Sequence, residues 1–217
     1  MLSPSSDIAT VGLRAAPTRL SARLVPGVHP DALRAFEQAR ETFVSGHRID
    51  MGGLATELGV DRTSVFRWVG NRDALLSEVL WSLAVPTLVQ AERAASEPGP
   101  DGAAPAGAAY LAALLSHFAT DLIEADYFRT FLSREPARAL RLLTTSASPI
   151  QQRYVATVEQ LVREHLGERP FDGAIDRHAL AYLLVRVSES FTYADLIAGE
   201  PPSTDAARSA FRHLLRA

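Results

Sequence analysis

LATELGVDRTSVFRWVGNRDALL, residues 54–76, is the stretch that determines the predicted fold. Asp50 is a suitable N-cap for a short helix that ends at Gly59, and Asp61 is a suitable N-cap for a second helix over Arg62–Val69. A short helix, a tight turn that contains glycine and another short helix together form the helix-turn-helix pattern. We therefore predict a helix-turn-helix at this position.

Two further helices flank this pattern. One begins at Pro30, where proline suits a first helical turn, and ends near Gly46. The other begins near Arg72, and we expect Pro86 to bend or interrupt it. The apolar stripe of the helix after Pro30 consists of Leu33, Phe36 and Phe43. Because such short helices cannot each bury a face alone, we predict a compact three-helix domain over residues 29–84.

The rest of the chain is predicted to be helical too. Residues 1–28 are rich in Ser, Pro, Thr and Gly without a sustained period, so we expect a flexible N-terminal arm, and the Pro/Gly/Ala-rich residues 97–107 indicate a linker. Apolar periodicity predicts helices over Ala108–Ala125, Tyr127–Thr144 (two, broken near Pro136), Pro149–Leu166, Ala174–Ala198 and Thr204–Arg216. The fold class is therefore all-α, with a larger helical domain over residues 85–217.

Composition excludes several classes of function. The chain has no Cys, which excludes disulfides and thiolate metal sites, and its six His are scattered, so we expect neither a metal site nor a cofactor. There is no Gly-rich phosphate loop, nucleophile elbow or His-Glu-x-x-His, so we do not expect an enzyme. No apolar run is long enough to span a bilayer and no signal peptide is visible, so we expect a cytoplasmic protein.

The net charge of -3 does not indicate a nucleic-acid binder, so any DNA contact must come from a local patch. All 22 basic residues are arginines, which we attribute mainly to biased composition because they are scattered. If the helix that starts at Met51 crosses the DNA backbone, the helix over Arg62–Val69 lies in the major groove. Early residues of that helix then face base edges; these are Arg62, Thr63 and Ser64.

Further DNA contacts are expected from later residues. Arg67 can reach a base or a phosphate, whereas Trp68 and Arg72 are placed for phosphates. Phe66 either faces DNA or packs beneath the helix, and the sequence leaves both open. In the N-terminal arm, three arginines could enter a minor groove, although we expect plain solvation in the free protein; they are Arg14, Arg19 and Arg23.

These residues resemble the DNA-binding domain of TetR/AcrR-type transcriptional regulators. The matches in the second helix and turn are Leu54, Ala55, Leu58, Gly59 and Val60, and those at the start of the next helix are Arg72, Asp73 and Leu76. Departures include Val69 in place of a common Phe and Met51 in place of a hydroxyl residue. The resemblance implies a homodimeric repressor that binds a double-stranded DNA operator and is released by a small-molecule effector bound to the domain over residues 85–217.

The predicted effector domain has a polar stripe on one helix face. Its members, spaced at i, i+3, i+4 and i+7, are Arg186, Glu189, Ser190 and Tyr193. We interpret the stripe as one wall of a ligand pocket, with an exposed or dimer-interface face as the alternative. Aromatic candidates to line an apolar cavity, which could also be plain core, are Phe118, Tyr127, Phe128, Phe131 and Tyr182.

The stretch RVSESFTYADLIAGEPP, residues 186–202, also resembles the QsdR-like subgroup of these regulators. That subgroup is associated with control of signal-lactone degradation, so the resemblance implies a lactone or an acyl-lactone as the effector. It also implies dimerisation through the last two helices. The faces proposed for the dimer are those of Ala207, Ala210, Phe211 and Leu214, which could instead close the core of the monomer.

Two other hypotheses remain open from the sequence. The near-neutral DNA domain is compatible with a helical effector-binding or protein-interaction module that has no DNA role. An enzyme acting in the C-terminal cavity is the weaker alternative, since no catalytic constellation supports it.

Overall fold

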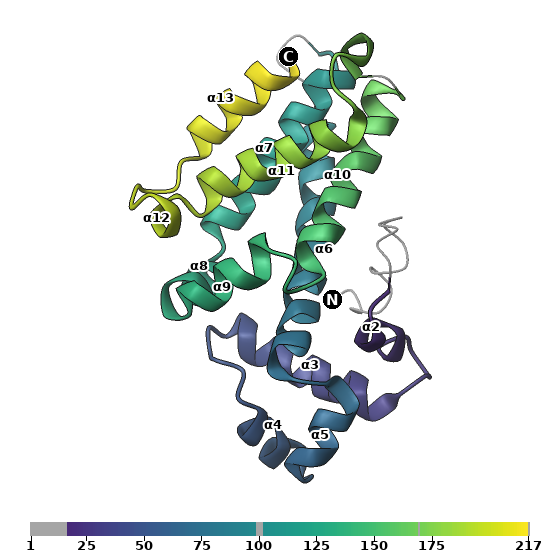
Figure 1. Ribbon diagram of the computed structural model, residues 1–217, viewed down its shortest axis with the longest axis vertical. Coiled ribbons are helices and arrows are strands. Elements are labelled where there is room, and N and C mark those ends of the chain that lie inside the picture. Colours follow the sequence, from purple (N-terminus) through teal and green to yellow (C-terminus); the bar gives the residue numbers. More distant parts are fainter. Residues whose placement is uncertain (1–16, 99–101, 169, 217) are drawn as a thin grey trace. The chain divides into compact units, whose positions relative to one another are not determined.

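The structure is a computed structural model that describes residues 17–98, 102–168 and 170–216. Within these ranges every regular element is a helix, which confirms the all-α prediction. The described residues form two compact units (Figure 1). The first unit comprises the chain up to Val85 together with Asp126–Gln151, and the second comprises Pro86–Ala125 and the chain from Gln152 onward.

The first unit is built around the predicted trihelical domain. Its helices are α3 (Pro30–Val44), α4 (Met51–Leu58) and α5 (Arg62–Val69), and α5 packs against both α3 and α4 (Figure 1). Asp50 and Asp61 are the N-caps of α4 and α5, as predicted. Gly59 ends α4 with φ 71°, a left-handed conformation that glycine adopts without steric cost and that turns the chain into α5.

Segments distant in sequence complete the first unit. The start of α6 (Arg72–Ala95) belongs to it, as do α8 (Asp126–Arg134) and α9 (Pro136–Thr144). The break between α8 and α9 lies at Pro136, as predicted. Although α8 and α9 fall within residues 85–217, which we assigned to the C-terminal domain, they form one compact body with the helix-turn-helix.

The N-terminal segment differs from the flexible arm that we predicted, in the part that the structure describes. Residues Arg19–Arg23 form helix α2, which has Thr18 as its N-cap. The Thr18 and Ser21 side chains and main-chain amides form a reciprocal capping box. Leu20 and Leu24 are buried, so apolar contacts hold this segment in place. Its composition, rich in Ser, Pro, Thr and Gly, did not indicate such contacts. Arg14 lies outside the described residues.

The second unit contains the remainder of α6, α7 (Gly107–Glu124), α10 (Ile150–Leu166), a 3₁₀ turn (Pro170–Gly173), α11 (Arg177–Thr192), α12 (Ala194–Ile197) and α13 (Thr204–Leu215). Helix α13 packs against α7 and α11, and α11 packs against α7 (Figure 1). Ala207 and Phe211 are fully buried in this packing. We had assigned both residues to a dimer face, and the structure corrects this: they close the core of the single chain.

Two boundaries differ from the sequence predictions. Helix α6 continues through Pro86 without interruption, since Val85 and Leu88 on either side of the proline are buried and their packing compensates for the lost main-chain hydrogen bond. The predicted helix Ala174–Ala198 begins later and divides at Tyr193 into α11 and α12.

By length and composition, α6 is the one helix among the described residues that could span a membrane. Of its most apolar window, 67% is buried inside the protein. A core helix passes the same test, so this feature is weak evidence for a membrane span.

Candidate DNA interface and effector site

One face of α5 is exposed, and the opposite face holds the helix to its domain. Val65 and Val69 are almost completely buried, so they anchor α5 against α3 and α4. Arg62, Thr63 and Arg67 are exposed. Phe66 is 38% exposed, and its ring lies 5.4 Å from the Arg62 guanidinium carbon, in the geometry of a cation–π contact. Phe66 therefore belongs to the outward face rather than to the core beneath it.

The position of Ser64 does not agree with the base contact that we predicted for it. It is 9% exposed, its main-chain N–H donates to Asp61 Oδ1 at 2.9 Å and its Oγ donates to Asp61 Oδ2 at 2.7 Å. These two hydrogen bonds lower the pKa of the Asp61 carboxyl. Arg67 Nη2 donates to the same Oγ at 3.3 Å. Ser64 therefore donates to the N-cap Asp61, and the shared carboxylate and guanidinium contacts fix the first turn of α5.

Trp68 is half-buried at the edge of the exposed face. Its ring meets His29 in an edge arrangement, with ring centroids 6.4 Å apart. Its main-chain carbonyl accepts a hydrogen bond from Arg23 Nη1 at 2.8 Å. The ring therefore stands between α5 and the segment before α3, and a phosphate contact through its indole N–H stays a prediction.

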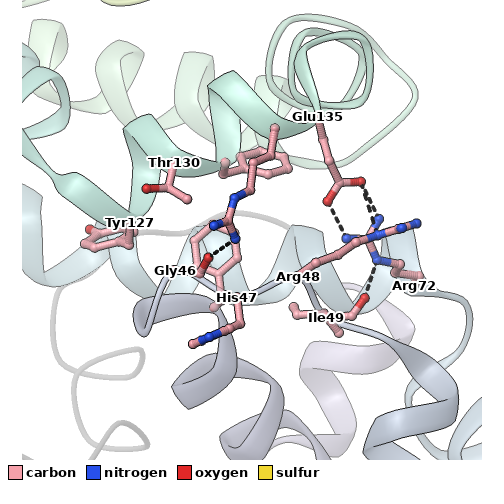
Figure 2. A pocket seen from close by; sticks show the side chains of 11 residues that line it. Gly46, His47, Arg48, Ile49, Arg72, Tyr127, Thr130 and Glu135 are labelled. Carbon is pink, nitrogen blue, oxygen red and sulfur yellow. Dashed lines mark hydrogen bonds and ion pairs between the residues drawn. The ribbon is translucent and has the colours of Figure 1, made fainter.

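Arg72 does not project toward solvent, as a phosphate contact would require. Its Nη1 and Nη2 donate to the two carboxylate oxygens of Glu135 at 2.6 and 2.5 Å, and its Nε donates to the Ile49 carbonyl at 2.5 Å (Figure 2). The side chain is only 13% exposed. Each of the three guanidinium nitrogens thus has an acceptor within the protein, so the structure does not support the phosphate contact predicted for Arg72.

The Arg72–Glu135 pair is the centre of a larger ion-pair network. Arg138 Nε lies 3.0 Å from Glu135 Oε2, and both Arg138 and Arg141 bind Asp73. Burial raises the pKa of Asp73, but hydrogen bonding to Arg141 and the charge of Arg138 outweigh this and leave it lowered. The hydrogen bond from Arg72 similarly lowers the pKa of Glu135. The network joins α9 and its N-cap Glu135 to the first turn of α6.

A second contact joins α8 to the loop between α3 and α4. Arg134 Nη1 donates to the Gly46 carbonyl at 2.5 Å (Figure 2). The adjoining cavity measures about 20 Å³, enough for roughly one water molecule but not for an effector. Its lining includes Tyr127 and Phe131, whose rings pack on Phe43 with centroids 6.0 and 5.5 Å away.

Three aromatic residues that we considered for the ligand cavity therefore serve the first unit. Tyr127 and Phe131 pack on α3, and Phe128 is buried in the same helix, α8. The structure does not group them with Phe118, which belongs to the second unit. Tyr127 and Phe131 thus fix α8 to the helix-turn-helix domain, whereas a common aromatic cavity with Phe118 stays a prediction.

The second unit buries a cluster of polar side chains between α10 and α11. Tyr154 donates from its hydroxyl to Ser188 Oγ at 3.1 Å, and its ring centroid lies 5.6 Å from that of Phe118. Burial raises the pKa of Glu189 to about 7, although Arg186 Nη1 lies 2.8 Å from its Oε2. Charged forms are therefore disfavoured here, and a substantial share of Glu189 is protonated near neutral pH.

The Tyr193 phenol interacts electrostatically with the same cluster. Burial raises its pKa, and the nearby Glu189 and Tyr154 raise it further. The structure thus groups the predicted Phe118, Glu189 and Tyr193 with Tyr154 and Ser188, which the sequence analysis missed.

The remaining members of the predicted polar stripe lie elsewhere. Ser190 is exposed and donates to the Arg186 carbonyl, and Tyr182 is 50% exposed. The Arg186 guanidinium lies between the two environments, 5.9 Å from the Tyr182 ring centroid and in contact with Glu189. The predicted stripe therefore divides into a buried part and an exposed part. Within the ranges that the structure describes, no cluster of His, Asp and Glu could hold a metal ion.

Comparison with known proteins places this geometry in a family. The family model described as the tetracyclin repressor-like C-terminal domain matches residues 106–216, slightly more than half of the chain. The chain belongs to the TetR family. TetR-family regulators are non-enzymatic, DNA-binding transcription factors with a ligand-binding domain, so the predicted family and the expectation that the chain is not an enzyme are confirmed. No match was found among curated proteins.

Two solved structures share the fold. The transcriptional repressor QsdR from R. erythropolis is 24% identical with a TM-score of 0.69, and the match covers 87% of this chain and 95% of that one. The TetR-family repressor AlkX from Dietzia sp. strain DQ12-45-1b, implicated in biodegradation of n-alkanes, is 18% identical with a TM-score of 0.55. That match covers 85% of this chain and 93% of AlkX.

The Arg72–Glu135 pair yields a stability prediction. We expect a double-mutant cycle of Arg72→Ala and Glu135→Ala to give a coupling free energy of unfolding of about 1–3 kcal/mol, because each single change removes the bidentate partner of a largely buried charge. The exposed pair Arg208–Asp205, three residues apart on one helix, is the control and should couple by less than about 0.5 kcal/mol. Equal coupling in both cycles, measured by urea unfolding, would contradict this role.

Glu189 yields a pH prediction. Since its folded pKa of about 7 exceeds the ordinary 4.5, its ionisation disfavours the folded state, and stability should be lost as pH rises from about 4.5 through 7. We expect Glu189→Gln to remove this loss and to be more stable than the parent at pH 8, by on the order of 2 kcal/mol. The exposed control Glu200→Gln should keep the parent profile. Parallel unfolding curves for the parent and Glu189→Gln between pH 5 and 8 would refute the assignment.

Proposed function

We propose that this TetR-family regulator is a homodimeric, cytoplasmic repressor that leaves its operator when a small, largely apolar ligand binds its second unit. The observation that supports the DNA-binding part most directly is the outward face of α5. Arg62, Thr63, Phe66 and Arg67 are exposed there, while Val65 and Val69 fix the helix from behind. A helix held in this way can enter a major groove with those side chains toward base edges and phosphates.

The effector is proposed to bind at the buried polar cluster of α10 and α11. Burial raises the pKa of Tyr154 and of Tyr193, so both phenols stay protonated at neutral pH. Protonated phenols, and Glu189 in its protonated form, donate hydrogen bonds, which suits a neutral ligand with carbonyl oxygens. Phe118 supplies an apolar wall beside Tyr154.

A lactone or an acyl-lactone fits this chemistry. Its carbonyl oxygen accepts hydrogen bonds, and an acyl chain would contact apolar surface. The similarity to the QsdR fold and the resemblance of residues 186–202 to the QsdR-like subgroup support this choice. AlkX is implicated in n-alkane biodegradation, but an n-alkane has no oxygen that could accept a hydrogen bond from a phenol or a protonated carboxyl.

We propose that α8 and α9 transmit release. Residues 126–151 belong to the first unit, and both ends of this segment continue into helices of the second, α7 through Ala125 and α10 through Gln152. The segment also contacts the first turn of α6 through Asp73 and Arg72, and the loop before α4 through Gly46. A ligand that displaces α7 or α10 would shift α8 and α9 and so disturb these contacts. The orientation of α4 and α5 would change as a consequence.

The proposed dimer face is the exposed stripe of α11. Tyr182 is 50% and Leu183 is 38% exposed, and Arg186 and Ser190 lie on the same side of the helix. An apolar patch with a polar rim is what a dimer of two-fold symmetry buries. Because Ala207 and Phe211 are core residues, α13 would contribute its outer side, which includes Ala210 and Leu214.

The alternative is an effector-binding module without a DNA role. The net charge of -3 favours it, since most of the chain repels phosphates. The two proposals differ in salt dependence: a repressor that binds phosphates shows a steep loss of affinity with salt on its selected DNA, and a protein without a DNA role shows none.

Operator binding tests the proposed function. DNA is selected from a random pool with the full chain, and binding of the selected sequence is measured at fixed salt. We expect Arg62→Ala and Arg67→Ala each to weaken binding by about 10- to 100-fold, because each removes a base or phosphate contact. Arg212→Ala, an exposed arginine of α13, is the matched control and should leave binding unchanged. Unaltered binding by both α5 variants would overturn the assignment of α5.

The same complex tests the effector class. An acyl-lactone should release the DNA, whereas an n-alkane of equal chain length should not. Release by the alkane alone would contradict the proposed role of the buried donors and leave the DNA-binding proposal in place.

Light scattering tests the dimer face. We expect Leu183→Glu to convert the dimer to a monomer, because a carboxylate in the proposed apolar contact would lose its water without gaining a partner. Val44→Glu, which alters a similarly exposed aliphatic residue in the first unit, is the control and should remain dimeric. A dimeric Leu183→Glu protein would exclude this face of α11.

A further inference from the structure

A groove of about 270 Å³ lies between α2 and α5 in the first unit. Three arginines line it, Arg19, Arg23 and Arg67, and no carboxylate is among the described residues of its wall. Phe66 and Trp68 supply aromatic surface beside them. In a chain of net charge -3, a concave site with three guanidinium groups and no acid is a local concentration of positive charge.

The wall formed by α2 is held in place by contacts within the unit. Leu20 and Leu24 are buried, and the Thr18 hydroxyl, which caps α2, also donates to Glu78 of α6. The groove is therefore formed before any ligand arrives, and its occupant does not have to order the segment.

The three arginines have different tasks. Arg23 Nη1 donates to the carbonyls of Arg67 and Trp68 at 2.6 and 2.8 Å, so it satisfies the C-terminal end of α5. Arg19 is exposed and forms no ion pair with any residue that the structure describes. Arg67 reaches Ser64 only by a long hydrogen bond of 3.3 Å. Arg23 is thus a positioning residue, whereas Arg19 and Arg67 are available to an anion.

We propose that this groove binds a backbone phosphate of the operator, next to the base pairs that α5 contacts. The inference rests on the proposed role of α5. Phe66 and Arg67 belong both to the groove and to the outward face of α5, so DNA lying on that face brings its backbone to the groove. Guanidinium forks match phosphate oxygens, and the aromatic walls can contact the adjacent sugar. Helix α2 thereby becomes part of the DNA interface.

The test uses the full chain and its selected operator. We expect Arg19→Ala to weaken binding by about 3- to 10-fold and to reduce the slope of log affinity against log salt by about 1, because one phosphate contact is lost. Arg19→Lys keeps the charge and should retain most of the slope. Arg212→Ala is the control and should retain the full affinity and slope.

A phosphate-by-phosphate map locates the contact. Single phosphates are replaced by neutral methylphosphonates, and the parent should lose affinity at one position per half-site that becomes insensitive in Arg19→Ala. Arg23→Met, which keeps the aliphatic stem but not the donors, should lower affinity without lowering the salt slope, since it acts through the position of α5.

The outcomes separate this inference from the proposed function. An unchanged salt slope and an unchanged methylphosphonate map for Arg19→Ala overturn the groove site, while loss of binding in Arg62→Ala and Arg67→Ala would still uphold α5. A parent protein that binds no selected DNA overturns both.

Discussion

The bidentate pair between Arg72 and Glu135 constrains both ends of the helix-turn-helix. Arg72 is the first residue of α6, three residues after the end of α5, and its Nε also donates to the Ile49 carbonyl, two residues before α4 begins. One guanidinium therefore fixes the entry to α4 and the exit from α5 relative to α8 and α9. Because charges of this burial are costly without a partner, loss of Glu135 would weaken the hold of Arg72 on both segments.

The helices of this chain could be predicted because their signals are local. The caps at Asp50 and Asp61, the turn at Gly59 and the apolar periods of three and four residues all lie within a few residues of the structure they specify. The Arg72–Glu135 pair could not be predicted in this way, since its partners are 63 residues apart and nothing near Arg72 distinguishes a phosphate-binding fork from one that binds a carboxylate. Helix α2 was missed because its burial depends on contacts made by α6.

The effector cluster shows the same limit. The spacing of Glu189 and Tyr193 revealed a polar stripe on an apolar helix, but Ser190 lies at the edge of that stripe away from the buried Glu189 and is exposed. Tyr154 belongs to a different helix and has ordinary sequence surroundings. Its role becomes visible only when α10 brings its hydroxyl to Ser188, 34 residues away. Periodicity in the sequence identifies which residues share a helix face. The residues that pack against that face are determined by the tertiary structure.

These contacts also change what the arginine content means. The 22 arginines are outnumbered by 25 acids, and counting them suggests a poor DNA binder. In the structure the arginines differ by partner: Arg72, Arg138 and Arg141 form ion pairs with Glu135 and Asp73. Among the described residues, Arg19, Arg62 and Arg67 form no ion pair, and Arg19 and Arg67 line one groove. Since short-range pairing screens the first set, the field that a DNA backbone meets at α5 is set by the second, and the net charge of the chain is a poor guide to it.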